Sequence, residues 1–284
     1  MTIKIITDST CNLPAGFAAA HDVRFVPISI QFGQETFQEG IDITREEFFA
    51  RIDAERIIPT TSQPPAGTFA EAYRQLVREG NQGIVVAITS LRSGVYQSAV
   101  LAKDLVPEAD VAVVDSLSIA YGTGFLVMDA VRLAEAGRKR EEIVRSIEAL
   151  RPVPGYLTPA TLRYLQMSGR IGKLQGALAS LLNIKAVISI HDGILDLEER
   201  VRTRSKALER VLERVAAAAG DTPMRFAVLH VAVPDEAAAF AAQVRQRLNC
   251  AEFYMAELSC SLAVHGGPGV IGLEWCKPGE KVAS

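Results

Sequence analysis

The sequence is poor in the residues that form metal sites and disulfides. Its four cysteines, Cys11, Cys250, Cys260 and Cys276, are scattered without a Cys-x-x-Cys pair, so they predict neither a zinc site nor a disulfide framework. The four histidines show no His-Glu-x-x-His or similar spacing. We therefore expect no metal centre, and we expect the cysteines to be small buried residues.

Long apolar runs and a strong excess of one charge are also missing. No run reaches the ~20 apolar residues that cross a bilayer, and the first residues lack the apolar core of a signal peptide. The formal net charge of -3 gives no general attraction for nucleic acid or for an anionic membrane surface. We expect a cytoplasmic protein that binds no nucleic acid.

Complete nucleotide-binding and hydrolase motifs are missing as well. Gly122 and Gly124 resemble the start of a dinucleotide fingerprint, but Val127 stands where a third glycine or an alanine belongs. Lys173 is followed by Leu174, whereas a phosphate-binding loop requires a hydroxyl residue there. No serine lies in a Gly-x-Ser-x-Gly elbow. The sequence therefore does not support ATP binding by this chain.

What the first half does contain is a repeated order of strand and helix. The 284 residues, 49% of them hydrophobic, suffice for two cores. The order predicts an N-terminal α/β/α domain of three layers, with a doubly wound parallel sheet. Thr44 and Glu47 form a capping box. Apolar patterns predict strands over 4–6, 24–32, 35–38, 84–88 and 111–114, and helices starting at Leu13-Pro14 and over 45–53, 68–79 and 95–106.

The layout changes near Arg151–Gly155, a plausible domain junction. We therefore expect domains at 1–152 and 153–284. Asp192-Gly193 predicts a hairpin turn, because both positions tolerate positive φ. The second half is expected to be an α+β domain with a mixed sheet and helices on one face. Its expected helices cover 158–166, 235–248 and a short piece after 258, and its expected strands cover 184–190, 194–201, 226–231, 253–258 and 270–275.

Small polar residues follow the buried strand 84–88. Ser90, Ser93 and Gly94 lie where the chain turns into the next helix. The first amides of a helix have no internal partner and attract anions, and glycine permits close approach of a ligand. The alternative is that these serines only cap the helix.

Three other segments offer polar side chains. Thr7-Asp8-Ser9 ends the first strand, and ligands gather at the carboxyl ends of open parallel sheets. The proline-bracketed segment Thr60–Gln63 is either a capping turn or a rigid loop that holds donors for a ligand. His265 precedes Gly-Gly-Pro-Gly, and it is either an exposed turn residue or a ligand contact. The basic run 200–210 is either a solvated helix face or a docking patch for an acidic partner.

Taken together, these segments resemble the DegV family, the acyl-binding proteins of bacterial fatty acid kinase systems. The resemblance extends over nearly the whole chain, and the order and spacing of the segments make it specific. The segments are TDSTCNLP (Thr7–Pro14), TSQPP (Thr61–Pro65), ITSLRSGVYQSA (Ile88–Ala99), VVDS (Val113–Ser116), SGRI (Ser168–Ile171), LLNIKAV (Leu181–Val187), RVRTRSKALE (Arg200–Glu209) and HGGPGVIG (His265–Gly272).

The resemblance implies that a long-chain fatty acid lies in a tunnel between two domains. The family's carboxylate ligands fall on Thr61, Ser93, the Gly94 amide and His265. We expect neutral donors to hold the carboxylate without a full counter-charge. Supporting polar residues are expected at Asp8, Ser9, Ser62, Ser90 and Ser116.

The resemblance also implies a partner. A separate kinase subunit would bind ATP and Mg²⁺ and phosphorylate the carboxylate, so this chain would be a non-catalytic subunit without a cofactor of its own. Arg202, Arg204 and Lys206 match the region that the family uses to meet the kinase. Transient membrane contact is expected during acyl exchange.

Three residues depart from the family pattern, and two other functions stay open. Asn12 replaces an aspartate, Val95 a threonine and Ser168 a glycine, and Val95 removes a hydroxyl close to the expected carboxylate. One alternative is an esterase or thioesterase that uses Ser93, His265 and an aspartate, either Asp8 or Asp115. The other alternative is a binder of a small anionic metabolite.

Overall fold

The computed structural model describes residues 2–55, 57–170 and 184–280. Its first sheet contains β1 (Ile3–Asp8), β2 (Arg24–Val26), β6 (Gln82–Ala87) and β7 (Val111–Asp115) in the order β2-β1-β6-β7. All three pairings are parallel. The predicted parallel sheet is therefore confirmed.

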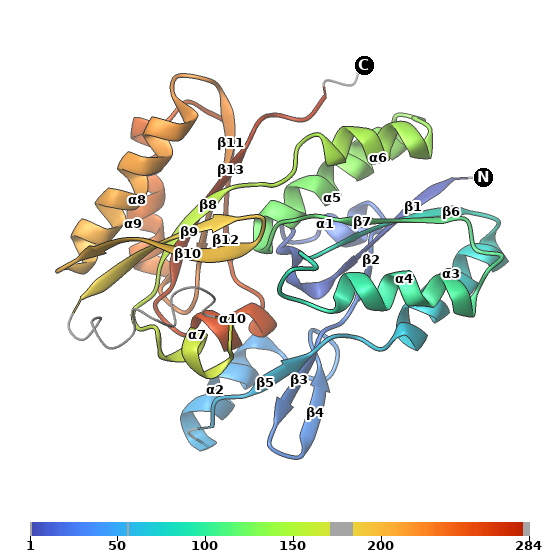
Figure 1. The fold of residues 1–284 in the computed structure, drawn as a ribbon, viewed down its shortest axis with the longest axis horizontal. Helices are drawn as coiled ribbons and strands as arrows, with labels where there is room; N and C mark the ends of the chain where they lie inside the picture. The colour runs from blue at the N-terminus through green and yellow to red at the C-terminus, as the bar shows by residue number, and fades with distance from the viewer. Residues whose placement is uncertain (1, 56, 171–183, 281–284) are drawn as a thin grey trace.

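Helices cover both faces of this sheet. In Figure 1, α3 (Ala66–Glu79) and α4 (Val95–Leu105) lie on one face, and α5 (Ala120–Glu135) and α6 (Arg140–Glu148) on the other. Side chains alternate along a strand, so Val85 packs with α3 and α4 while Val86 packs with α5 and α6. Both faces of β6 are buried, and the three-layer prediction is correct.

A small antiparallel sheet stands beside the first. It contains β3 (Ser29–Phe32), β4 (Glu35–Gln38) and β5 (Thr60–Ser62) in the order β4-β3-β5. The prediction of one strand over 24–32 is wrong. Pro27 has no N–H for a ladder, and the chain leaves the parallel sheet at Val26 and enters the second sheet at Ser29. The segment predicted as a loop contributes β5 to this sheet.

The helices around this small sheet differ in length from their predictions. A helix was expected to start at Leu13-Pro14, but the chain forms a 3-10 turn over Ser9–Cys11 and a four-residue α1 (Phe17–Ala20). The capping box before α2 (Arg45–Glu55) is confirmed: the Thr44 amide donates to the Glu47 carboxylate, and the Glu47 amide donates to the Thr44 hydroxyl.

The C-terminal sheet is mixed, as predicted. It contains β8 (Gly155–Thr158), β9 (Lys185–His191), β10 (Ile194–Val201), β11 (Met224–His230), β12 (Cys250–Glu257) and β13 (Ile271–Cys276). Their order is β10-β9-β8-β13-β11-β12. Only the β11–β12 pairing is parallel among these described strands. Asp192 and Gly193 have φ of 53° and 69°, so the predicted hairpin turn is confirmed.

One helix of this half was misplaced. The range 158–166 was predicted as helix, but β8 continues to Thr158 and α7 covers only Arg163–Met167. Pro159 disfavours a helical conformation for the residue before it, and β8 pairs with β9 and β13. The remaining helices are α8 (Arg204–Ala219), α9 (Pro234–Arg247) and α10 (Cys260–Gly266).

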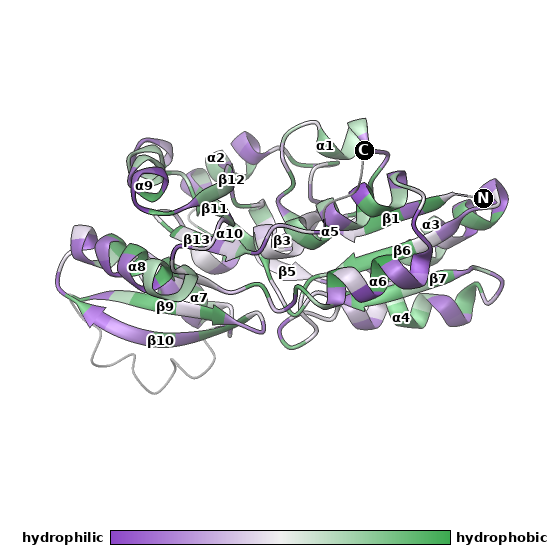
Figure 2. Ribbon diagram, turned by 90° about the horizontal axis from the view of Figure 1, so that it is seen from above, coloured by the Kyte–Doolittle hydropathy of each residue, from purple (hydrophilic) through white to green (hydrophobic). Residues whose placement is uncertain are grey.

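The two faces of the mixed sheet have different neighbours. Phe226 and Val228 of β11 pack with α8 and α9, whereas Ala227 and Leu229 belong to the core that contains α5. One hydrophobic core therefore contains residues from both halves of the chain. Figure 2 shows the central strand β6 as mostly hydrophobic and the edge strand β10 as mostly hydrophilic. The boundary between residues 152 and 153 stays a prediction.

Within residues 2–55, 57–170 and 184–280, no helix is both long enough and apolar enough to cross a bilayer.

Candidate functional site

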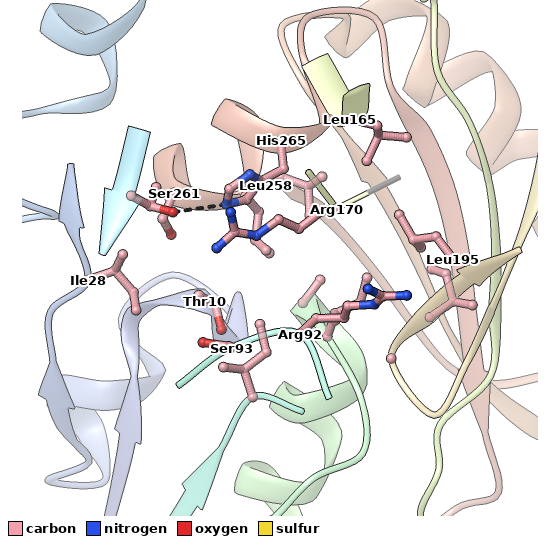
Figure 3. A pocket seen from close by; sticks show the side chains of 18 of the residues that line it. Thr10, Ile28, Arg92, Ser93, Leu165, Arg170, Leu195, Leu258, Ser261 and His265 are labelled. Carbon is pink, nitrogen blue, oxygen red and sulfur yellow. Dashed lines mark hydrogen bonds between the residues drawn. The ribbon is translucent and has the colours of Figure 1, made fainter. Parts of the chain in front are cut away.

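A cavity lies where the parallel sheet, the small sheet and the mixed sheet meet. Its empty space amounts to about 1140 Å³, a figure that includes open solvent at its mouth. Figure 3 shows that Thr10, Ser93, Ser261 and His265 surround one space. Ser261 and His265 both lie on α10, and the other two residues come from the N-terminal half of the chain. Apolar side chains form most of the remaining wall, including Ile28, Ile88, Ile119, Leu157, Leu195 and Leu229. The cavity thus combines a polar group of residues with long apolar walls.

Thr61 and His265 meet in this cavity although they are 204 residues apart. Thr61 lies on β5 and His265 near the end of α10, with 3.0 Å between Thr61 Oγ1 and His265 Nε2. Burial and the positive charge of Arg170 together lower the pKa of His265 to about 4. His265 is therefore neutral at pH 7.

The neutral state of His265 determines what Thr61 can offer. A neutral imidazole carries one N–H and one acceptor nitrogen. With the proton on Nε2, the ring donates to Thr61 Oγ1 and leaves the Thr61 hydrogen free for a ligand oxygen. His265 Nδ1 is buried without a hydrogen-bond partner among the described residues.

Ser93 and Gly94 lie at the start of α4, and both line the cavity. The Val95 amide donates weakly to Ser93 Oγ at 3.4 Å, so Ser93 has a capping role as well. A Cβ atom at Gly94 would come within 2.8 Å of the Gln63 side chain, which also lines the cavity. A side chain at residue 94 would therefore have to displace the Gln63 amide group, which packs against the Gly94 backbone.

Asp8 organises the carboxyl end of β1. Its carboxylate accepts the amide hydrogens of Thr10 at 3.0 Å and Ile88 at 2.9 Å and also the Thr10 hydroxyl hydrogen. Burial raises the pKa of Asp8, although these hydrogen bonds lower it. Thr10 and Ile88 line the cavity. Asp8 therefore supports the wall from behind, which fits its predicted supporting place.

Ser9 belongs to a network around Glu39 that the sequence analysis missed. Glu39 is buried directly after β4 and accepts the Ser9 hydroxyl at 2.6 Å. It also accepts the Ser261 hydroxyl at 2.7 Å and the Ser261 amide at 2.9 Å. Ser261 lies in the first turn of α10, four residues before His265. Glu39 therefore fixes the start of the helix that carries His265.

The other predicted supporting serines lie in three different places. Ser62 lines the cavity and accepts a hydrogen bond from the Gln31 amide at 2.9 Å. Ser90 lies in an adjoining open depression on the surface. Ser116 is buried behind the site, where it bonds to Ser118 and Thr123. The structure therefore brings Ser62 to the cavity itself but not Ser116.

Two arginines, Arg92 and Arg170, were missed as site residues. Both line the cavity and the adjoining depression, which also contains Ser93 and Gly94. In Figure 3 the guanidinium of Arg170 lies toward Ser261, and that of Arg92 lies toward Leu195. Neutral donors alone were expected, so the positive charge beside them differs from the prediction. Arg92 belongs to the ITSLRSGVYQSA segment and Arg170 to the SGRI segment. Neither segment alone predicts where the long arginine side chain lies.

The three predicted docking residues differ in their surroundings. Arg202 and Lys206 are exposed near the start of α8, and Lys206 Nζ is 3.8 Å from Glu213. Arg204 is half-buried and donates to the carbonyl oxygens of Thr158 and Gly269, each at 2.7 Å. It also pairs with Glu236 at 2.9 Å. Arg204 thus holds the glycine loop after His265, and the docking role stays a prediction.

The departures from the family pattern have local explanations. Asn12 adopts φ of 47°, and its side chain donates to the Glu257 carbonyl at 2.8 Å. Val95 is buried in the core of α3 and α4 and does not line the cavity. Ser168 lies in the surface depression. Ile171 of the SGRI motif, 181–183 of LLNIKAV and the Lys173-Leu174 position lie outside the described residues.

The geometry does not assemble the catalytic triad of an esterase. His265 Nε2 bonds to Thr61, and no carboxylate bonds to His265 among the described residues. Asp8 is engaged by Thr10 and Ile88. Asp115 accepts the amides of Ser90 and Leu117. A triad requires a base that is oriented by a carboxylate, and neither predicted aspartate takes that role here.

Comparisons with known proteins identify the family. The DegV model, described as "Uncharacterised protein, DegV family", matches residues 2–278. A DegV domain-containing protein of Streptomyces coelicolor is 35% identical over 274 residues, which cover 95% of this chain and 97% of that protein. Protein DegV of Bacillus subtilis is 30% identical over 279 residues, covering 97% and 99%.

Solved structures match over the same extent. A DegV family protein from Thermus thermophilus, described by its fatty acid binding, has a TM-score of 0.91 and 33% identity, covering 98% of this chain and 100% of that one. A stearic acid-binding protein from Eubacterium ventriosum has a TM-score of 0.90 and 31% identity, covering 97% and 98%. With this fold and these matches, the chain belongs to the DegV family.

Proposed function

We propose that this chain binds a long-chain fatty acid in the cavity between its sheets. The carboxylate lies at Thr61, Ser93, the Gly94 amide and His265, and the acyl chain lies along the apolar wall. The observation that carries this proposal is the Thr61–His265 contact at 3.0 Å at the polar end of a largely apolar cavity. The descriptions of the Thermus thermophilus and Eubacterium ventriosum proteins support the same ligand class.

The energetics favour firm retention of such a ligand. Burial of an acyl chain contributes ~0.8 kcal/mol per methylene, so a long chain gains about 10 kcal/mol before the ordering costs are subtracted. A buried carboxylate needs several donors to offset its desolvation. Hydroxyls and a free amide supply these donors, and Arg170 adds positive charge beside them.

The apolar walls disfavour a small anionic metabolite as the ligand. Such a ligand would use only the polar end and would leave the cavity-facing sides of Leu157, Leu195 and Leu229 without a ligand contact. A fatty acid uses both parts of the cavity.

The second part of the proposal is presentation of the bound fatty acid to a kinase subunit. The partner binds ATP and Mg²⁺, a carboxylate oxygen attacks the terminal phosphorus, and ADP leaves as the acyl phosphate forms. Ser93, Gly94, Arg92 and Arg170 line both the cavity and the open depression, so the carboxylate end adjoins the surface. Exposed Arg202 and Lys206 are the proposed docking residues for the kinase. The protein is proposed to be cytoplasmic and to exchange its fatty acid during transient contact with the membrane.

Intact-mass measurement tests the proposed ligand directly. Protein purified under native conditions is expected to show 30.7 kDa plus the mass of a fatty acid, and lipid analysis of an extract identifies it. A chain that carries no acyl ligand and takes up none from solution would contradict the proposal.

Substitutions locate the carboxylate. Thr61→Ala and Ser93→Ala each remove a hydroxyl donor and are expected to weaken fatty acid binding by about 1 to 3 kcal/mol. Affinity is measured by displacement of a fluorescent fatty acid. Thr60→Ala is the matched control, because Thr60 is exposed on the same strand and bonds to Gln31. Unchanged affinity in both site variants would rule out this carboxylate position.

A further inference from the structure

Glu274 places a carboxyl group in the wall of the same cavity. Its side chain is only 1% exposed, and the Gly122 amide donates to Oε2 at 2.6 Å. Burial raises the pKa of Glu274 and the Gly122 and Tyr121 amides lower it, and the net effect is a pKa of about 8. Glu274 therefore carries a proton at neutral pH, and a protonated carboxyl can donate as well as accept.

The sequence of β13 explains why Glu274 faces the cavity. Side chains alternate along a strand, and Ile271, Leu273 and Trp275 pack in the core beneath α8 and α9. Gly272 and Glu274 face the opposite side and line the cavity. Gly155 lies opposite Glu274 in the sheet, where a Cβ atom would come within 2.8 Å of Glu274 Cγ. The glycine makes room for the glutamate.

Glu274 lies farther along β13 than the residues beside the proposed carboxylate-binding end. Val270, Gly272 and Glu274 all line the cavity, so the cavity follows β13. Val270 comes directly after the glycine loop that follows His265. Four residues of extended chain span about 13 Å, so an acyl chain that starts at His265 and follows β13 would bring its middle beside Glu274.

The chemistry of Glu274 is unlike that of its surroundings. Leu157, Ile190 and Ile119 line the same cavity, and an acyl chain of methylene groups gives a carboxyl group no hydrogen bond. A protonated carboxyl group has one O–H donor and acceptor positions on both oxygens, and the Gly122 amide occupies one of these positions. The remaining capacity is available to a polar group on the ligand.

We propose that Glu274 recognises a hydroxyl group in the middle of the acyl chain, so that the ligand is a mid-chain hydroxy fatty acid. The ligand hydroxyl accepts a hydrogen bond from the carboxyl group or donates one to it. This inference rests on the proposed function. The alternative is that Glu274 only caps α5, whose N-cap Ile119 makes no side-chain capping bond.

Oleate and ricinoleate test the inference, because they differ by one mid-chain hydroxyl. Equal concentrations of the two acids compete for the delipidated chain, and native mass spectrometry reads the ratio of the two complexes. The chain is expected to prefer ricinoleate, and Glu274→Leu is expected to shift the ratio toward oleate by about tenfold. Glu274→Gln keeps a donor and an acceptor, so it should retain most of the ricinoleate preference.

The outcomes separate this inference from the proposed function. A preference for oleate in the unmodified chain would overturn the role of Glu274, since burial of an unpaired hydroxyl is unfavourable. If Glu274→Leu does not fold, the preference of the unmodified chain alone decides whether the inference holds. Equal ratios in the unmodified chain and Glu274→Leu would leave Glu274 as a helix cap only. A chain that takes up neither acid would contradict fatty acid binding itself.

Discussion

His265 acts in the polar end of the cavity as an uncharged side chain. Its pKa is lowered from 6.5 to about 4 by burial and by Arg170. Between these two pH values the unfolded chain binds one proton more than the folded chain at this residue. The contribution of His265 to stability is therefore complete above pH 6.5 and is lost as the pH falls toward 4.

The expected result is a pH-dependent difference between the unmodified chain and His265→Gln. As the pH falls from 6.5 to 4, the unmodified chain should lose about 1.4 kcal/mol per pH unit more than the variant. Denaturant unfolding at a series of pH values measures this difference. His191→Gln, at an exposed turn, reports the effect of replacing a surface histidine. Parallel pH curves for the unmodified chain and His265→Gln would contradict the buried neutral state.

The sequence predicted the small polar residues of the site better than the long ones. Thr61 belongs to a proline-bracketed polar loop, and Ser93 and Gly94 lie where a helix begins. Both patterns can be seen in a few neighbouring residues. Arg92 and Arg170 are close to these patterns, but the position of a guanidinium depends on packing between separate segments. Glu39 and Glu274 are buried carboxyls whose partners are 222 and 152 residues away. No local pattern contains such pairs.

α10 is a seven-residue helix that depends on side chains from elsewhere. Ser259 caps it by accepting a hydrogen bond from the Leu262 amide, and Glu39 accepts two hydrogen bonds from Ser261. Helices this short are marginal on their own, so these contacts determine where His265 lies. Glu39 is therefore expected to position His265 for the proposed carboxylate site.

Glu39→Ala tests this role. The change leaves the Ser9 and Ser261 hydroxyls and the Ser261 amide without their acceptor, and it should lower the free energy of unfolding by about 1–3 kcal/mol. Fatty acid affinity should fall as well, because the Thr61–His265 contact loosens. Glu35→Ala is the control, since Glu35 is exposed in the same hairpin and pairs with Arg51. Lower stability with unchanged affinity would show that Glu39 does not position α10 for binding.

Strand prediction succeeded where apolar runs were short and bounded by turn residues, as in β6, β7 and the β9–β10 hairpin. It failed where tertiary pairing decided the structure. Thr158 extends a strand because β8 pairs on both sides, and Pro27 divides one apolar run between two sheets. Such pairings join residues that are far apart in the sequence, so they cannot be predicted from local periodicity.

The two halves of the chain are joined by a buried ion pair. Both nitrogens of the Arg225 guanidinium end donate to Asp129, at 2.8 and 2.7 Å. Asp129 lies on α5 and Arg225 on β11, and both side chains are almost fully buried. Arg225 also donates to the Lys277 carbonyl, and the pair raises the pKa of the arginine. Removal of Asp129 leaves the Arg225 charge buried without its carboxylate partner, whereas Asp129 itself also pairs with Arg132.

Asp129→Ala is therefore expected to cost about 3–5 kcal/mol of unfolding free energy. Arg74→Ala, which removes an exposed pair with Glu71, should cost less than about 1 kcal/mol. Denaturant unfolding measures both variants. A cost for Asp129→Ala as small as that of Arg74→Ala would show that the pair does not hold the halves together.

The separation of Thr61 and His265 by 204 positions also has a consequence for biosynthesis. The ribosome must deliver nearly the entire polypeptide before these two side chains can meet. If the proposed carboxylate site needs both residues, a fatty acid binds there only when synthesis of the chain is almost finished. A bound fatty acid stabilises the completed fold by mass action. It does not stabilise a folding intermediate in which His265 is still missing from the site.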